Sequence, residues 1–243
     1  MVEYWIKNTM NISLFIQFIT LIINMYVLTI PVIGINILLS QLLIFEFIVQ
    51  LIEIIFYYWM SNNLSSVKNI TTIRYYDWMI TTPTMLVTLI IYLIYLKLDS
   101  KLYMNSQSNN DYNHDNDKDD PKKNNYNAWK LFMDNKFVII NVLLLNWLML
   151  LFGYLGEVKY LSINTSVILG FIPFLIYFYL IYTEFAQFSS YGITIFLYFF
   201  IVWGIYGIAA LFPYKIKNIC YNFLDLFSKN FFGLFLSYLL FFK

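Results

Sequence analysis

The chain has 243 residues, of which 60% are hydrophobic and only 12% are charged, and its formal net charge is +1. A soluble globular domain is less apolar and carries about twice the share of charged residues, so this composition predicts a protein that crosses a membrane several times. The near-neutral charge gives no reason to expect a nucleic-acid partner, and the single cysteine, Cys220, excludes an internal disulfide.

Seven apolar runs are long enough to cross a bilayer, since a span needs roughly 20 mostly apolar residues. The sequence therefore predicts an all-α membrane protein, a bundle of seven transmembrane helices that forms a single domain over residues 1–243. In chain order, the predicted spans are residues 11–30, 34–59, 73–97, 135–155, 160–183, 189–212 and 216–241. The N-terminal segment lacks the basic residues and small-residue cleavage site of a signal peptide, so we expect the first span to be retained.

The connection between the third and fourth spans, at about residues 102–127, is a polar insert. It is rich in Asn, Asp and Lys and lacks the apolar residues of a core, so we expect it to be disordered. Its aspartates lack the glycine turn and terminal glutamate of an EF-hand loop, so we predict no metal site.

Lysine positions predict the orientation of the chain in the membrane. If seven spans alternate, eight lysines lie on the side of the polar insert and the C-terminus. Five lie on the other side, namely Lys7, Lys68, Lys159, Lys215 and Lys217. Because positive residues are more frequent on the cytoplasmic side, this bias predicts a cytoplasmic C-terminus and an N-terminus outside.

Charged residues inside the spans are the strongest sign of function. Each costs roughly 2.5–3.5 kcal/mol on insertion scales, so each should face the bundle interior and have a partner. These residues are Glu46, Glu53, Arg74, Asp77, Asp225 and Lys229.

The spacing of these charges places them on shared helix faces. Asp225 and Lys229 lie four residues apart on the last span, and Arg74, Asp77 and Thr81 share one face of the third. We expect the two faces to meet around Lys229. These charges form either a purely structural group of ion pairs between the two spans or a functional site. The chemistry supports the functional site, since a desolvated lysine is the usual candidate for a Schiff base with an aldehyde.

Three motifs in these spans resemble those of the microbial rhodopsins. RYYDWMITTP, residues 74–83, resembles the third-helix signature of that family, and LDLFSKNFFG, residues 224–233, resembles the last helix that carries the retinal lysine. WGIYG, residues 203–207, is similar to the Trp-x-x-Tyr pair of the sixth helix. The motifs occur in the order of the family, and the resemblance covers the whole chain except the polar insert.

The resemblance implies a photoreceptor, not an enzyme, with all-trans retinal bound covalently as a Schiff base on Lys229. Asp77 would be the primary counterion and proton acceptor, and Asp225 the second counterion. Arg74 would be their electrostatic partner, and Thr81 would belong to the same counterion complex.

The motifs also imply which residues line the retinal, namely Trp78, Thr82, Trp203 and Tyr206. Ordinary membrane packing is the alternative for the aromatic ones, since the chain has 24 Phe and 22 Tyr. Three positions depart from the archetypal pumps. Gly207 replaces a proline, Ala210 replaces a further tryptophan, and Thr88 replaces the carboxylate that returns a proton to the Schiff base. A threonine does not donate a proton readily, so Thr88 disfavours a fast proton pump.

Polar stripes run along the first, second and last spans, which are neighbours in this family. Stripes that meet would line a hydrated path, and rows of carboxylates favour cations. Hydrogen bonding between helices is the alternative, and it explains the amides better than two glutamates one heptad apart. The residues predicted to line the ion path are Ser13, Gln17, Glu46, Glu53, Asn218 and Asn222.

The glutamate pair on the second span resembles the pore of channelrhodopsins. Together with the small size, the Ser/Gln pair of the first span and the two Asn of the last, it resembles the viral rhodopsins of group 1, which are light-gated cation channels. The resemblance implies conduction of monovalent cations and protons across a lipid bilayer. The alternatives are an outward light-driven proton pump, a sensory rhodopsin and a membrane protein that binds no retinal. Family members form dimers, trimers or pentamers, and the sequence does not decide whether this chain forms a homo-oligomer.

Overall fold

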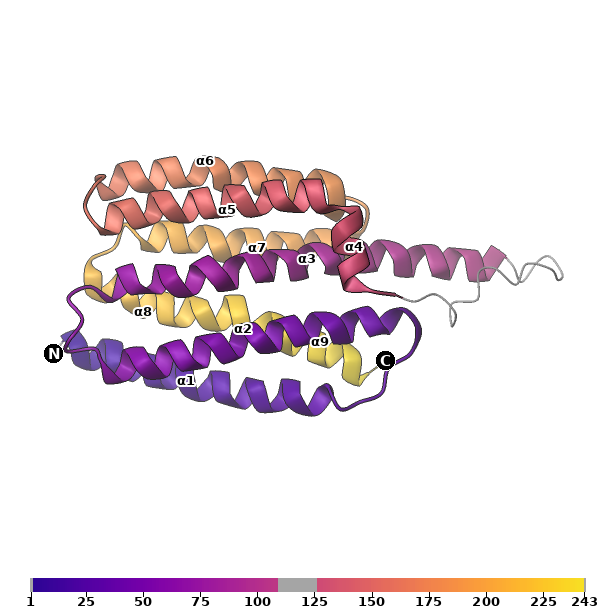
Figure 1. Cartoon of the computed structure of the whole chain (residues 1–243), viewed down its shortest axis with the longest axis horizontal. Coiled ribbons are helices and arrows are strands. Elements are labelled where there is room, and N and C mark those ends of the chain that lie inside the picture. Colours follow the sequence, from indigo (N-terminus) through magenta and orange to yellow (C-terminus); the bar gives the residue numbers. More distant parts are fainter. Residues whose placement is uncertain (1, 109–125, 243) are drawn as a thin grey trace.

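The structure, a computed structural model, describes residues 2–108 and 126–242. Helices and short connections account for all of these residues (Figure 1). Seven helical segments of the described chain are long and apolar enough to span a membrane. The predicted all-α fold with seven transmembrane helices is therefore confirmed.

Six of the spans consist of one principal helix each, and the seventh has three parts. The six are α1 (Val2–Val27), α2 (Ile37–Asn62), α3 (Ile70–Ser108), α5 (Lys136–Glu157), α6 (Ile163–Ile181) and α7 (Ser190–Ala209). The last span joins α8 (Tyr214–Asp225), the π-helical turn η3 (Leu226–Asn230) and α9 (Phe231–Phe241). Three shorter elements complete the fold: η1 (Gly34–Asn36), α4 (Ala128–Asp134) and the π-helical turn η2 (Tyr182–Ala186).

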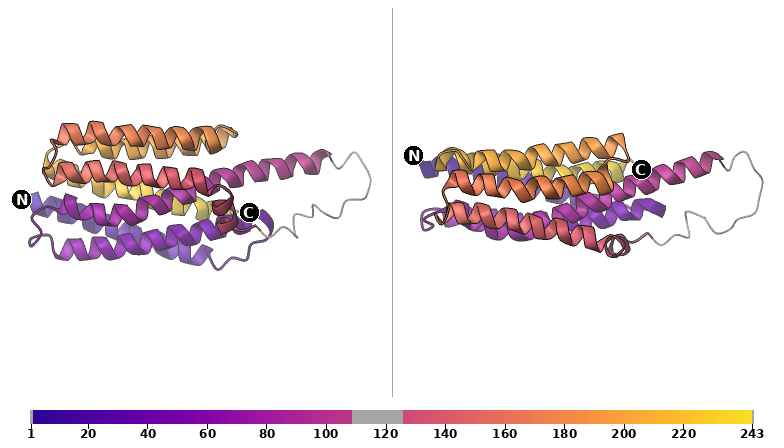
Figure 2. Two further views of the ribbon diagram at one scale, coloured as in Figure 1. Left: turned by 45° about the horizontal axis from the view of Figure 1, so that its top comes forward. Right: turned by 90° about the horizontal axis from the view of Figure 1, so that it is seen from above.

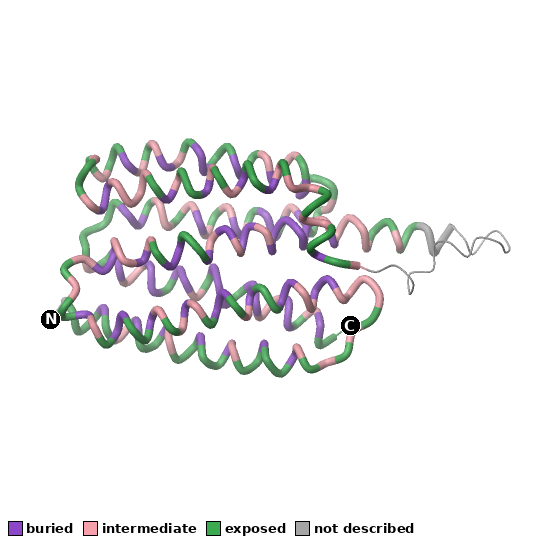
Figure 3. Tube along the Cα trace, viewed as in Figure 1, coloured by how far each residue is buried: buried purple, intermediate pink, exposed green. Residues whose placement is uncertain are grey.

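The spans form a closed ring, because each contacts the next in chain order and the last contacts the first. Buried residues lie on the helix faces that turn toward the middle of the ring, and exposed residues lie mostly on the outer faces (Figure 3). We call the end of the bundle that carries the N-terminus the N-terminal end. The opposite end carries the C-terminus and is called the C-terminal end (Figure 1).

The helix α1 begins nine residues earlier than the predicted first span. The polar residues Glu3 and Lys7 lower the hydropathy of this segment, so the sequence pattern misses it. Ile6 and Met10, one turn apart, are nevertheless fully buried in a cluster that includes Tyr57. Tertiary packing thus extends the helix beyond its apolar run.

The helix α3 continues to Ser108, into the first part of the predicted polar insert. At 1.5 Å per residue its 39 residues measure about 58 Å, which is longer than a bilayer core, and its end projects beyond the bundle (Figures 1 and 2). The rest of the predicted insert, residues 109–125, lies outside the described residues. The short helix α4, which the sequence did not predict, follows and lies across the bundle axis. Gln41 of α2 holds its start by accepting a hydrogen bond from the Ala128 N–H (2.7 Å).

Small residues set the contact between α5 and α6. A Cβ added to Gly156 would lie 2.2 Å from Ser166 Oγ and 2.7 Å from Ser166 Cβ. Small residues at membrane helix contacts allow the two backbones to approach closely. Gly156 is therefore required at this contact, and Gly204 of α7 offers a comparison, because a Cβ there would meet only Phe174 at an ordinary 3.8 Å.

We predict that Gly156→Ala lowers the stability of the protein, by about 1–3 kcal/mol as overpacking of a tight contact usually does. Gly204→Ala is the control and should leave stability unchanged or slightly higher. Thermal unfolding of both variants in detergent measures the difference. Equal melting temperatures for the two variants would contradict the close contact.

Candidate functional site

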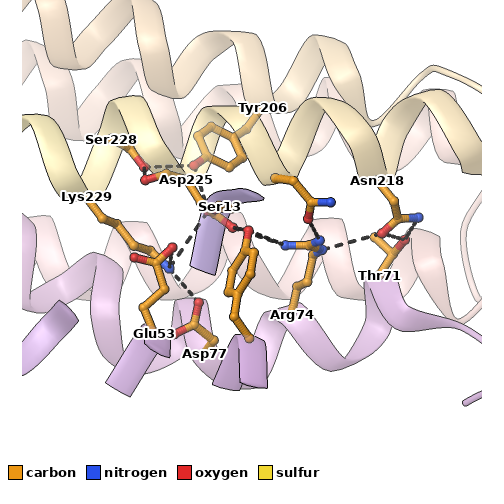
Figure 4. Close-up of polar contacts among 12 residues, drawn as sticks. Ser13, Glu53, Thr71, Arg74, Asp77, Tyr206, Asn218, Asp225, Ser228 and Lys229 are labelled. Carbon is orange, nitrogen blue, oxygen red and sulfur yellow. Dashed lines mark hydrogen bonds and ion pairs between the residues drawn. The ribbon is translucent and has the colours of Figure 1, made fainter. Parts of the chain in front are cut away.

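The Lys229 ammonium lies at the centre of a buried charged cluster. Its Nζ is 2.6 Å from Asp77 Oδ2 and 3.8 Å from Asp225 Oδ1, so the third and last spans meet at this lysine, as their spacings predict. Only 4% of Lys229 is exposed. Figure 4 shows its side chain extending from the last span toward α2 and α3.

Glu53 of α2 is a third carboxylate at the same lysine. Its Oε1 lies 3.6 Å from Lys229 Nζ, and neither of its oxygens has a hydrogen-bond partner among the described residues. The sequence predicted Glu53 in an ion path but did not predict this contact. With Arg74, the fully ionised cluster contains two positive and three negative groups. Its net charge of −1 is unfavourable in a buried site, so one further proton or cation would neutralise it.

Arg74 lies on the N-terminal side of Lys229 and is fully buried. Its Nη1 lies 3.1 Å from Asp225 Oδ2, and its Nε and Nη2 donate to the side-chain oxygens of Asn218 and Asn222. The sequence predicted both asparagines in the ion path. In the structure they hold the guanidinium, so any path past this point also passes Arg74.

Asp225 is the most completely satisfied carboxylate of the cluster. Besides Arg74, it accepts hydrogen bonds from the hydroxyls of Tyr57 (2.5 Å) and Tyr206 (2.8 Å). The sequence analysis missed Tyr57, although a signal existed. Tyr57 lies four residues after Glu53 and so continues the polar stripe of α2.

Asp77, in contrast, has one oxygen without a partner. Its Oδ2 contacts Lys229, and its Oδ1 accepts no hydrogen bond from the described residues. Thr81 shares the face of Asp77, but its hydroxyl donates to the Asp77 main-chain carbonyl (2.9 Å) and not to the carboxylate. Thr81 thus lies next to the cluster without completing it.

Lys229 belongs to the π-helical turn η3, which interrupts the last span between α8 and α9. Such turns occur frequently at functional sites. Tyr198 of α7 donates a hydrogen bond to the Phe227 carbonyl inside this turn (2.5 Å). A neighbouring helix therefore supports the irregular backbone that positions the lysine.

A largely apolar cavity extends from Lys229 between the helices. All four residues predicted to line the retinal line this cavity: Trp78, Thr82, Trp203 and Tyr206. The sequence missed the opposite walls, which include Met149 and Gly153 of α5 and Gly170 and Phe174 of α6. An apolar space that is lined by a lysine amine fits retinal, which is a polyene aldehyde.

Of the two small residues that depart from the archetypal pumps, Gly207 lies in α7 and Ala210 directly follows it. A Cβ at Gly207 would lie 2.7 Å from the ring of Phe171, which lines the cavity. Ala210 lines the same region. The Phe171 ring of α6 thus packs directly against the backbone of Gly207.

Asn146 of α5 is a further buried polar residue that the sequence analysis missed. It is fully buried, and its Nδ2 donates to the Thr82 hydroxyl (2.9 Å). A single amide in the apolar run VLLLNWLML was the available signal, since polar residues inside spans are costly. The contact fixes one wall of the cavity to α5.

The remaining predicted path residues are buried but do not form one continuous hydrogen-bonded chain. Gln17 donates to the Ser13 hydroxyl (3.0 Å), while Gln17 Oε1 has no partner in the described part of the chain. Glu46 lies two turns away from Glu53, at about 10 Å along α2. Its carboxyl lies near the Thr88 hydroxyl, but that hydroxyl donates to the Thr84 carbonyl, and neither Glu46 oxygen has a hydrogen-bond partner in the described part of the chain.

A second buried ion pair lies toward the N-terminal end of the bundle. Lys217 Nζ of α8 contacts Glu157 Oε1 of α5 at 2.5 Å, and both side chains are at least 90% buried. Lys217 is therefore an interior residue, although the sequence analysis counted it with the loop lysines.

The family described as "Bacteriorhodopsin-like protein" matches residues 8–242 of the chain. Among solved structures, the viral rhodopsin OLPVRII is similar with a TM-score of 0.73 and 24% identity, and the match covers 96% of this chain and 95% of that one. The thermophilic rhodopsin from Rubrobacter xylanophilus has a TM-score of 0.67 and 19% identity, and the match covers 98% of this chain and 95% of that one. Xanthorhodopsin, described as a light-driven ion pump with dual chromophore, has a TM-score of 0.68 and 15% identity, and the match covers 98% of this chain and 93% of that one. No curated protein matches the chain. At these identities the similar structures show a shared fold.

We predict that Lys217→Met destabilises the protein, because it leaves Glu157 buried without its partner. Removing one member of a buried ion pair typically costs about 3–5 kcal/mol. The double variant Lys217→Met with Glu157→Gln should recover most of this loss. Thermal unfolding of both variants is the measurement, and a double variant no more stable than the single one would contradict a buried pair.

Proposed function

The chain belongs to the bacteriorhodopsin-like protein family, and on that premise we propose that it is a retinal-binding photoreceptor that acts as a light-gated cation channel. One observation carries the proposal. Lys229 lies between an apolar cavity on one side and a cluster of carboxylates on the other. The cavity suits a chromophore, and the carboxylates suit a positive charge on the lysine nitrogen.

Lys229 would hold all-trans retinal covalently through its amine, and Trp78, Thr82, Trp203 and Tyr206 would line it. Bound retinal supplies visible-light absorption and a light-driven change of shape. The protein supplies a cavity that excludes water and a counterion at the attachment point. Burial alone would disfavour a positive charge on Lys229, but the carboxylates around it favour that charge, since opposite charges nearby stabilise the ionised form.

Asp77 is the proton acceptor in this proposal, and Asp225 is the second counterion. Asp77 Oδ2 is the carboxylate oxygen nearest to Lys229 Nζ, and its Oδ1 is without a partner in the described structure. Asp225 accepts from two tyrosine hydroxyls and pairs with Arg74, so its negative charge is already stabilised. A proton leaving the lysine nitrogen therefore has a nearer and less satisfied acceptor in Asp77.

Glu53 links the chromophore site to the proposed ion path. Loss of the proton from the lysine nitrogen removes the positive charge that Glu53 faces at 3.6 Å. Buried polar atoms of the predicted path residues that lack protein partners in the described structure, such as Gln17 Oε1, are groups that water satisfies readily. A hydrated row of polar groups with glutamates at intervals favours cations over anions.

Glu46 supports the second candidate function, an outward proton pump. The sequence places a threonine, Thr88, where pumps carry a proton-donating carboxylate. Glu46 of the neighbouring helix brings a buried carboxyl to the side of Thr88. A carboxyl is therefore present at this level of the bundle, and the absence of an acid at position 88 alone is a weak argument against pumping.

The membrane orientation is proposed from the lysine bias. Because Lys217 is buried in an ion pair, the N-terminal side keeps four of its five counted lysines against eight on the other side. The bias toward a cytoplasmic C-terminus becomes stronger.

We predict that adding all-trans retinal to the purified chain produces a visible absorption band. Lys229→Ala should abolish it, because no other amine lines the cavity within the described residues. Lys215→Ala, a change outside the cavity, is the control and should keep the band. A band that persists in Lys229→Ala would overturn the attachment site.

We predict that illuminated cells expressing the chain carry a photocurrent that reverses sign near the cation equilibrium potential. Glu53→Gln should reduce this current several-fold while pigment still forms, because the path loses a carboxylate next to Lys229. Glu184→Gln, at an exposed glutamate of η2, is the matched control. A current of one direction at all voltages would instead establish the pump.

A further inference from the structure

The proline inside α3 leaves one main-chain carbonyl without its helical donor. The helix continues through Pro83, whose nitrogen carries no hydrogen. The Met79 carbonyl, four residues earlier, therefore lacks the N–H that would bond it in a regular helix. Trp147 of α5 supplies the missing donor, because its indole Nε1 lies 3.0 Å from the Met79 oxygen. A neighbouring helix thus completes the hydrogen bonding of α3.

The carbonyls on either side of Met79 accept side-chain hydrogen bonds from threonines one turn later. These bonds run from Thr81 to Asp77 (2.9 Å), from Thr82 to Trp78 (2.7 Å) and from Thr84 to Ile80 (2.9 Å). The position that would serve Met79 in the same way is 83, and it holds the proline. Each of the four consecutive carbonyls at residues 77–80 therefore accepts a side-chain donor. Three of these donors come from α3 itself, and the fourth, Trp147, comes from α5.

The location of Trp147 explains why its N–H needs a protein partner. It is the twelfth of the 22 residues of α5, whereas tryptophans in membrane proteins are enriched at the two membrane interfaces. Its side chain lies on the outer face of the bundle and is 44% exposed. Lipid tails offer no hydrogen-bond acceptor, so an indole N–H at this depth is costly unless the protein accepts its bond. The Met79 carbonyl and the indole therefore satisfy each other.

The residue before Trp147 contacts the same turn of α3 from the inside. Asn146 is fully buried, and its Nδ2 donates to the hydroxyl of Thr82, which directly precedes Pro83. Two consecutive residues of α5 thus bind α3 next to its proline, one from the interior and one from the outer face. Together they fix this turn of α3 relative to α5.

Asp77 belongs to the turn that Trp147 completes. Its carbonyl is the first of the four, and Met79 follows two residues later. Its carboxylate has few other restraints, because Oδ2 contacts Lys229 at 2.6 Å and Oδ1 has no partner among the described residues. The course of the α3 backbone therefore decides how closely this carboxylate approaches the lysine.

We propose that Trp147 is a positioning residue of the chromophore site, which holds Asp77 at Lys229 by bonding the carbonyl that Pro83 leaves free. The inference rests on the proposed retinal-binding function, in which Asp77 is the counterion of the lysine nitrogen. Without the indole N–H, the Met79 carbonyl has no donor, and the turn that carries Asp77 is no longer fixed. The alternative is that Trp147 only fills space against α3.

A double-mutant cycle in the purified chain with all-trans retinal separates these two roles. Trp147→Phe keeps an aromatic ring and removes the N–H, and Pro83→Ala restores a main-chain N–H that bonds Met79 without Trp147. We expect Trp147→Phe alone to lower the melting temperature by about 2–4 °C, as loss of one hydrogen bond does in a chain of this size. It should also move the visible band to longer wavelength, because a more distant counterion stabilises the charge at the lysine nitrogen less. In the Pro83→Ala background, Trp147→Phe should change neither quantity.

Trp59→Phe on α2 is the matched control, because Trp59 is also 44% exposed and its indole makes no hydrogen bond within the described chain. This variant should keep the parental band and melting temperature. Equal effects of Trp147→Phe in the parent and in the Pro83→Ala background would show a packing role and overturn the proposal. A fall in stability with an unchanged band would overturn the positioning of Asp77.

The melting temperature also separates this inference from the proposed function, because it is measured with or without bound retinal. A parent that forms no visible band would refute retinal binding. If Trp147→Phe forms no pigment, adding Pro83→Ala should restore it. If neither variant forms pigment, the melting temperatures decide, and a loss of stability from Trp147→Phe that persists in the Pro83→Ala background overturns the role of Trp147.

Discussion

The contact between Lys229 and three carboxylates is the constraint on which the rest of the structure depends. An ammonium and carboxylates in the middle of an apolar bundle are costly unless they meet with good geometry. Asp77, Asp225 and Glu53 come from three different spans, so pairing them with one lysine fixes how α2, α3 and the last span are arranged. The π-helical turn at Lys229 and the bond from Tyr198 to its backbone belong to the same arrangement.

The partners of the carboxylates give them different chemical properties. Asp225 is surrounded by donors from Arg74, Tyr57 and Tyr206, and its negative charge is stabilised by protein groups alone. Asp77 and Glu53 depend mainly on the lysine. A change of charge at Lys229 therefore acts mostly on Asp77 of α3 and on Glu53 of α2, which belongs to the proposed ion path.

The position of Lys229 also connects two functional regions that do not overlap. The apolar cavity lies among α3, α5, α6, α7 and the last span, whereas the polar stripes lie among α1, α2 and the last span. Only the last span belongs to both regions. A movement of the turn η3 would transmit a change in the cavity to polar groups that do not line it.

The seven spans and the pairing of two helix faces around Lys229 follow from the sequence alone, whereas the four aromatic and threonine residues of the cavity were implied by the resemblance of its motifs to the microbial rhodopsins. Apolar runs, charges inside spans and fixed helical spacings are local properties that a sequence shows directly. Only the tertiary structure decided that Glu53 joins the lysine, that Asn218 and Asn222 hold Arg74, and that Glu46 lies beside Thr88. These contacts join residues of different helices, and their choice depends on how the helices rotate and shift against one another. Local helical spacing leaves those two degrees of freedom open, and the burial of charge in the assembled bundle sets them.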